Sequence, residues 1–194
     1  MPILHVQLSG QAQTPSGQTI SITPSQALRV KGPVVQATVG PVQSLIDQWT
    51  QQGITLPVPL SGKALIDTRA SVTCIDDAIA QQLGLPVIDV VPMISASHVT
   101  QQNVYPIQFI VGGQLIFNVE RALGANLAAQ GLILLIGRDV LQTCTLHYNG
   151  AAREFTLALW RPRGAPSPGD HGCSARGRSG ACVPAVPGVA QQIV

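Results

Sequence analysis

The sequence predicts a mainly β fold. Aromatic residues make up 4% of the 194 residues, while Val, Ile and Thr recur in short runs that Gly, Pro and Asn interrupt, a pattern that favours strands. Hydrophobic residues make up 45% and charged residues 10%, which is too little charge for a disordered chain or a polybasic nucleic-acid binder. We therefore expect one folded domain with one site.

Short apolar runs bounded by turn residues predict the strands. The first run begins with alternating apolar and polar residues, as in a half-buried strand, and residues 13–26 indicate a loop or hairpin. The polar residues 97–103 and the glycines 112 and 113 are expected to separate later strands. The expected strands are 3–10, 33–40, 63–67, 86–97, 105–113 and 114–123, then two strands around a helical turn within 131–150, and finally 153–159.

Two segments carry a helical pattern. Residues 42–53 have apolar residues at three- and four-residue spacings and end at Gly53, which predicts a short amphipathic helix packed on the outside of the domain. A role of this helix in substrate selection or dimer contacts is the alternative. Residues 74–85 predict a second short helix, closed by Gly84.

Composition divides the chain into three parts. After Trp160 the sequence becomes rich in Pro, Gly, Ser and Arg, which predicts a disordered tail. Five of the eleven basic residues follow residue 150, so the net charge of +2 gives little support for a nucleic-acid partner. The expected parts are an N-terminal extension with a strand and hairpin at 1–29, the domain at 30–160 and the tail at 161–194.

Neither a membrane span nor a metal site is expected. No run reaches the roughly 18 apolar residues of a membrane helix, and the start lacks the pattern of a signal peptide, so we expect a cytoplasmic protein. The four cysteines and four histidines show no zinc-ligand spacing. Cys74 and Cys144 lie in apolar runs and are expected to be buried free thiols, whereas Cys173 and Cys182 could pair in an oxidising setting.

Two motifs carry the candidate chemistry, "ALIDTRAS" at 64–71 and "LILLIGRDVL" at 132–141. Together they resemble the retropepsin-like aspartic proteases, in which an apolar strand ends in Asp-Thr/Ser-Gly-Ala and a later apolar strand runs into Gly-Arg-Asp or Gly-Arg-Asn. The similarity covers about residues 30–160. It implies an all-β, acid-protease-like closed β-barrel with one or two short helices.

The resemblance implies an aspartic endopeptidase that uses no cofactor and acts as a homodimer. Such hydrolysis needs one carboxylate to deprotonate water and a protonated carboxyl to donate to the scissile carbonyl. Two aspartates about 3 Å apart share one proton and so supply both groups. The chain has a single Asp-Thr or Asp-Ser pair, Asp67-Thr68, so the second aspartate is expected from another copy.

The family pattern also assigns roles to individual residues. By resemblance Asp67 is the catalytic carboxylate, and Thr68 makes a hydroxyl hydrogen bond between the two copies. A flap around residues 95–105 covers an extended peptide substrate, which we expect to be cleaved best at mildly acidic pH. The rest of the active-site loop is Arg69, Ala70 and Ser71, and the supporting motif is Leu135, Ile136, Gly137, Arg138 and Asp139.

The chain departs from the family pattern at two positions. Arg69 stands where the family has Gly, and a guanidinium close to a carboxylate favours its ionised form and discourages the shared proton. Ser71 stands where the viral members have an Asp that is the acidic partner of the motif arginine. Arg138 therefore lacks this partner, and one of three other acidic residues is expected to replace it. Those three residues are Asp76, Asp77 and Asp139.

Arg69 keeps two further hypotheses open. One is a catalytically inactive member of the fold, kept as a dimerisation or peptide-binding module in which Arg69 neutralises the carboxylates. The other is a once-active peptidase in which Arg69 and the tail are recent mutations or sequence errors. Cleavage that depends on Asp67 separates the active enzyme from the binding module.

Overall fold

The computed structural model describes residues 2–8, 11–13, 19–21, 23–94 and 99–160. The predicted tail, with Cys173 and Cys182, lies outside these residues. The elements are β1 (Ile3–Gln7), β2 (Gln11–Gln13), β3 (Thr19–Ser21), α1 (Pro24–Lys31), β4 (Val34–Pro41), α2 (Gln43–Gln51), β5 (Leu60–Ile66), β6 (Cys74–Asp76), α3 (Asp77–Gln82), β7 (Asp89–Ile94), β8 (Val99–Val111), β9 (Leu115–Ala125), the 3-10 turn η1 (Ala128–Gln130), β10 (Leu134–Ile136), α4 (Arg138–Leu141), β11 (Cys144–Asn149) and β12 (Glu154–Leu159).

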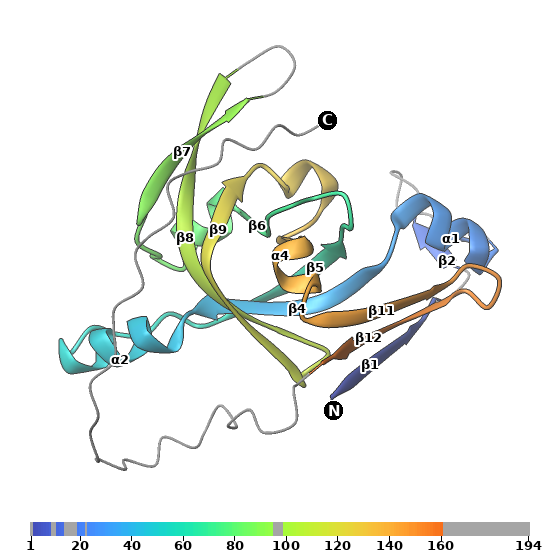
Figure 1. Ribbon diagram of the computed structural model, residues 1–194, viewed down its shortest axis with the longest axis horizontal. Coiled ribbons are helices and arrows are strands. Elements are labelled where there is room, and N and C mark those ends of the chain that lie inside the picture. The colour runs from blue at the N-terminus through green and yellow to red at the C-terminus, as the bar shows by residue number, and fades with distance from the viewer. Residues whose placement is uncertain (1, 9–10, 14–18, 22, 95–98, 161–194) are drawn as a thin grey trace, which may run out of the picture.

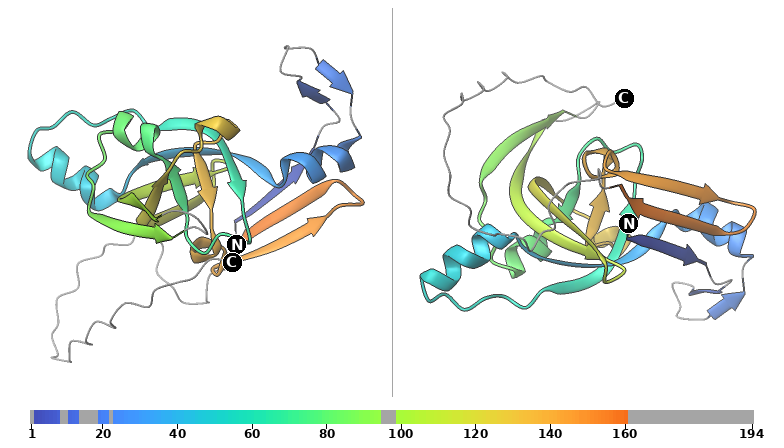
Figure 2. Two further views of the ribbon diagram at one scale, coloured as in Figure 1. Left: turned by 90° about the horizontal axis from the view of Figure 1, so that it is seen from above. Right: turned by 60° about the horizontal axis from the view of Figure 1, so that its bottom comes forward.

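Six strands close into a barrel. They follow the order β4-β5-β10-β6-β9-β8, and β8 pairs back onto β4. The ladder is mixed, because β10 runs parallel to β5 and antiparallel to β6. β7 adds to β8 outside this ring, and a separate sheet of β1, β12 and β11 lies on the side of the barrel away from α2 (Figures 1 and 2). The predicted all-β closed barrel is confirmed.

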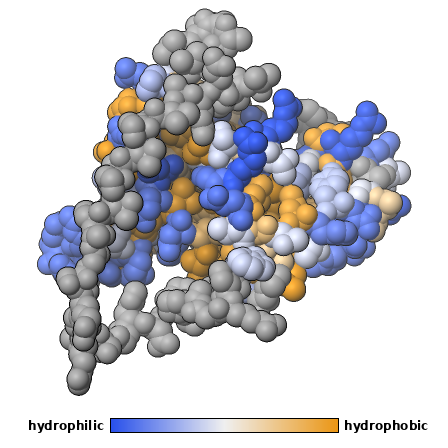
Figure 3. All heavy atoms as spheres, in the orientation of Figure 1, coloured by the Kyte–Doolittle hydropathy of each residue, from blue (hydrophilic) through white to orange (hydrophobic). Residues whose placement is uncertain are grey.

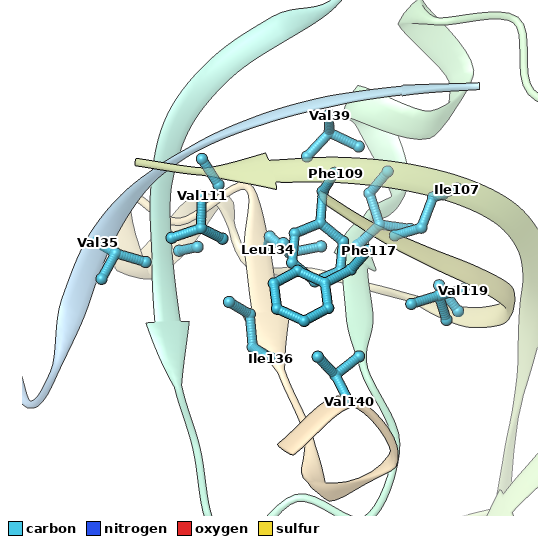
Figure 4. Close-up of a cluster of buried hydrophobic side chains, with 14 of the residues drawn as sticks. Val35, Val39, Ile107, Phe109, Val111, Phe117, Val119, Leu134, Ile136 and Val140 are labelled. Carbon is cyan, nitrogen blue, oxygen red and sulfur yellow. The ribbon is translucent and has the colours of Figure 1, made fainter. Parts of the chain in front are cut away.

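Large apolar side chains fill the barrel (Figure 4). Phe109 and Phe117 stack with their ring centroids 5.1 Å apart. Leu134 and Ile136 of the short strand β10 are fully buried in the same cluster. Burial of a side chain of this size contributes roughly 1.5–3 kcal/mol. A strand of only three residues is thus held by packing as well as by its two ladders.

Hydrophilic and hydrophobic residues occupy different regions of the surface. On the face shown in Figure 3, hydrophilic residues gather over α2 at one end and over the tips of β11 and β12 at the other, with hydrophobic residues between them. No helix in the described part of the chain is both long enough and apolar enough to cross a membrane.

The two predicted helices are present as α2 and α3. α2 ends before Gly53, whose φ of 67° fits the predicted glycine stop, and its Leu45 and Trp49 pack against the core from outside. α3 is shorter than residues 74–85, because 74–76 form β6 and pair with both β9 and β10. Backbone pairing inside the barrel therefore overrides the helical pattern at its first three positions.

Two more helices are α1 and α4, of which α4 is the helical turn expected within residues 131–150. α1 begins with a capping box, in which the Thr23 hydroxyl accepts from the Gln26 N–H and the Gln26 side chain accepts from the Thr23 N–H. Pro24 occupies its first turn, as is common in helices. The sequence Thr-Pro-Ser-Gln is thus a helix start that the loop or hairpin interpretation of residues 13–26 missed.

The prediction that the polar stretch 97–103 separates two strands is wrong for residues 99–103. Within it, residues 99–103 belong to β8, which pairs with β7 from Asp89↔Val104 to Ile94↔Val99. Backbone hydrogen bonds to β7, rather than apolar burial, stabilise this part of the strand, which explains why it carries no apolar run. Residues 95–98 lie outside the described part.

Asp76 joins two distant segments beneath the barrel. Its side chain is buried, and Oδ1 accepts hydrogen bonds from the N–H groups of Ala78 and Ile79, which caps α3. Oδ2 accepts from the N–H groups of Leu127 and Ala128, each at 2.8 Å. One carboxylate therefore satisfies four backbone donors where β6 meets α3 and β9 meets η1.

We predict that Asp76→Ala lowers the free energy of unfolding by about 3 kcal/mol, since it removes a helix cap and leaves buried N–H groups without acceptors. Urea denaturation measures the change. Asp47→Ala is the matched control, because exposed Asp47 accepts, among the described residues, only from the Gln43 side chain, and it should cost less than about 0.5 kcal/mol. An equal loss of unfolding free energy in the two variants would contradict the role of Asp76 as a buried acceptor for backbone N–H groups.

Candidate active site

The candidate loop, residues 67–73, leaves the barrel between two strands that flank β10. In β10, Leu135 lies opposite Leu65 of β5 on one side and Cys74 of β6 on the other. The loop therefore passes over the end of β10 as it connects β5 to β6. The Asp67 N–H continues the ladder by donating to the Ile136 carbonyl at 3.0 Å, so this residue is fixed at the point where the sheet ends.

The Asp67 carboxylate faces partly into solvent. Its Oδ1 accepts a hydrogen bond from the Arg69 N–H at 2.8 Å, the geometry of an Asx turn. Among the described residues its second oxygen, Oδ2, has no hydrogen-bond partner. Thr68 and Arg69 expose their side chains, and neither ion pair in the described chain includes Arg69. Within one copy, the described structure thus has no ion pair between the Arg69 guanidinium and Asp67.

The start of α4 holds the loop through backbone hydrogen bonds. The Arg138 N–H donates to the Ala70 carbonyl at 2.9 Å, and the Asp139 N–H donates to the Ser71 carbonyl at 3.2 Å. These N–H groups belong to the first turn of α4, where no partner exists within the helix. Gly137 permits the approach, because a Cβ there would lie 2.5 Å from the Val72 carbonyl carbon.

Asp139 clamps the other end of the loop. Its Oδ2 accepts from the Thr73 N–H at 2.9 Å, and its Oδ1 accepts from the Thr73 hydroxyl at 2.7 Å. The same hydroxyl accepts from the Gly137 N–H at 3.1 Å. Thr73 is fully buried and was not among the residues predicted from sequence. A hydroxyl residue between apolar neighbours, two positions after Ser71, was the available signal.

Arg138 has none of the three acidic partners considered for it. Its side chain is exposed, and the two ion pairs of the described chain do not include it. Asp76 and Asp139 accept from the groups given above, while Asp77 accepts from the Tyr105 hydroxyl at 2.7 Å. Each carboxylate is thus engaged by a neutral donor. Arg138 therefore supports the loop through its backbone N–H.

The predicted flap coincides in part with the β7–β8 hairpin, which rises from the same end of the barrel as the candidate loop (Figures 1 and 2). Its base is tied to α3, because Asn103 and Tyr105 both donate to Asp77 Oδ1, at 3.3 and 2.7 Å. An Arg121–Asp89 ion pair joins β9 to the start of β7. The hydrogen bond from Arg121 lowers the pKa of the Asp89 carboxyl.

The two described cysteines are free, as predicted, although both are partly rather than fully buried. Burial, followed by the negative charges of Asp139 and Asp67, raises the pKa of the Cys74 thiol to about 11. This thiol therefore stays protonated at neutral pH. No cluster of three His, Cys, Asp or Glu side chains suitable for a metal occurs in the described chain.

We predict that Thr73→Val lowers the free energy of unfolding by about 2 kcal/mol, because it leaves the buried Gly137 N–H without an acceptor and removes the hydroxyl that donates to Asp139 Oδ1. Thr73→Ser is the matched control, since it keeps the hydroxyl and loses one methyl group, and should cost at most about 1 kcal/mol. Thermal or urea unfolding gives both values. A serine variant less stable than the valine variant would refute the clamp.

Cys74 should react slowly with iodoacetamide at pH 8, because the thiolate is the reacting species and the pKa is raised to about 11. Peptide mass spectrometry after timed alkylation measures the rate at this site. The same protein unfolded in urea is the control and should be modified at the rate of an ordinary cysteine. Equal rates for folded and unfolded protein would show that Cys74 is not shielded.

Comparisons with known proteins find similar solved structures but no similar sequence. No protein-family model matches the sequence, and no curated protein matches it. The structure matches a retropepsin-like aspartic protease from Rickettsia conorii, with a TM-score of 0.42 and 14% identity over 81% of this chain and 92% of that one. It also matches the protease of simian foamy virus, with a TM-score of 0.36 and 17% identity over 56% of this chain and 91% of that one.

Proposed function

We propose that this chain is one half of an aspartic endopeptidase in which Asp67 and its counterpart in a second copy activate the attacking water. The observation that carries the proposal is the local geometry of Asp67. A rigid loop, held by the Asp139 clamp and by the start of α4, presents a carboxylate that is partly exposed and has one oxygen without a partner in the described chain. A side chain kept only as a turn former does not need that support.

Two copies are required because the chemistry needs two carboxyl groups. One removes a proton from water while the other donates to the scissile carbonyl, and close aspartates share a single proton for this purpose. No other Asp-Thr or Asp-Ser pair occurs in the chain. An isologous dimer about a two-fold axis at the loop supplies the second group.

The substrate in this proposal is an extended peptide bound beneath the β7–β8 hairpin. An extended peptide can be recognised as an added strand, with alternate side chains entering pockets. The β7 and β8 strands rise from the end of the barrel that carries the loop (Figure 1), and they are anchored there through Asp77 and Asp89.

A second candidate function is peptide binding without cleavage, which Arg69 favours. Two guanidinium groups next to the paired carboxylates of a dimer would hold both in the ionised form and remove the shared proton. Against this, Arg69 reaches Asp67 only through its backbone N–H within one copy. The exposed side chain has room to point away from the dyad.

We predict that the full chain cleaves members of a diverse peptide library between pH 3.5 and 7, and that Asp67→Asn reduces the rate at least about 100-fold by removing the acid–base group. Arg69→Gly, which restores the family residue, should raise the rate. Arg29→Gln is the control, because this exposed arginine lies on α1 and should leave cleavage unchanged.

The outcomes separate the two functions. Cleavage by the natural sequence that is lost in Asp67→Asn supports the peptidase. Cleavage only by Arg69→Gly would mean that Arg69 disables the enzyme and that the natural chain is a binding module. Cleavage that survives Asp67→Asn would contradict the proposed mechanism.

A further inference from the structure

A large groove lies between β1 and the outer face of the barrel, away from the Asp67 loop. Its volume is about 890 Å³. One wall is the outer face of the β4–β5 pair, where Val34 lies opposite Leu65 and Gln36 lies opposite Lys63. The facing wall comes from β1 and the residue just beyond it, through Leu4, Val6 and Leu8, which alternate and so share one side of the strand.

The β4–β5 wall is mainly a side-chain face, whereas β1 is an edge strand whose one ladder among the described residues is with β12. In the part of β4 that lines the groove, Val34 to Gln36 pair with β5, and the ladder with β8 begins only at Ala37. Most of the side chains that a ligand in the groove meets are apolar. The volume falls within the roughly 300–1,000 Å³ typical of small-molecule sites.

The charges at the groove have a single sign. The chain contains two lysines, Lys31 and Lys63, and both line the groove. No Asp or Glu is among its lining residues, whose other polar side chains are Gln36 and Gln130. Neither lysine belongs to an ion pair in the part of the chain that the structure describes. An apolar slot with two unneutralised ammonium groups is complementary to an anion that carries an apolar chain.

We propose that this groove binds a long-chain carboxylate, with the alkyl chain between β1 and the β4–β5 face and the carboxylate at Lys31 and Lys63. The alkyl chain displaces water from apolar walls, which is favourable in proportion to the area covered. The lysines select the negative head group. This binding is independent of the Asp67 loop and of peptide cleavage.

Isothermal titration calorimetry of the full chain with dodecanoate, below its micelle concentration, tests the proposal. We expect one dodecanoate per chain and at least tenfold weaker binding of dodecyltrimethylammonium, which has the same alkyl chain and the opposite charge. Each methylene added from octanoate to dodecanoate should strengthen binding by up to about fourfold. These measurements require no peptidase activity, so they stand or fall apart from the proposed function.

Substitutions locate the site. Lys31→Gln and Lys63→Gln should each weaken dodecanoate binding about three- to fivefold, because both remove an exposed cation without disturbing the core. Arg29→Gln on the same helix as Lys31, outside the groove, should leave affinity unchanged. Circular dichroism verifies that each variant is folded. Equal affinity for the anionic and cationic detergents, unchanged binding in both lysine variants, or no binding by the folded protein would overturn the proposal.

Discussion

The hydrogen bonds between Asp139 and Thr73 hold the candidate site together. They join the end of the β5–β6 loop to the turn that follows β10, two segments separated by 66 residues in the sequence. Because the Thr73 hydroxyl also accepts from Gly137, the turn and the loop cannot move independently. The position of Asp67 depends on this junction, since Asp67 begins the loop that Thr73 ends.

The clamp in turn depends on the core. β10 has only three residues, yet Leu134 and Ile136 are completely buried beneath the stacked Phe109 and Phe117. Their burial fixes the end of β10, and the Ile136 carbonyl then fixes the Asp67 backbone. The position of a partly exposed carboxylate is thus set by apolar packing inside the barrel, which gives the rigidity that acid–base chemistry requires.

Local signals predicted much of this arrangement. The strand before Asp67, the Gly137 turn and the glycine stops of α2 and α3 each follow from a few consecutive residues. The Thr73–Asp139 pair could not be read in this way, because it exists only when β10 lies between β5 and β6. Residues 99–103 were missed because their strand is stabilised by pairing with β7, which leaves no apolar pattern in the sequence.

The central claim is that one active site uses Asp67 from two copies. Peptidase activity in equal mixtures of the natural chain and Asp67→Asn, after full subunit exchange, tests it most directly. If both aspartates are needed, only dimers of two natural chains cleave. Random pairing makes these one quarter of all dimers, so activity at the same total concentration of chains falls to one quarter of the natural value. Activity of one half would show that each copy acts alone and would contradict the account.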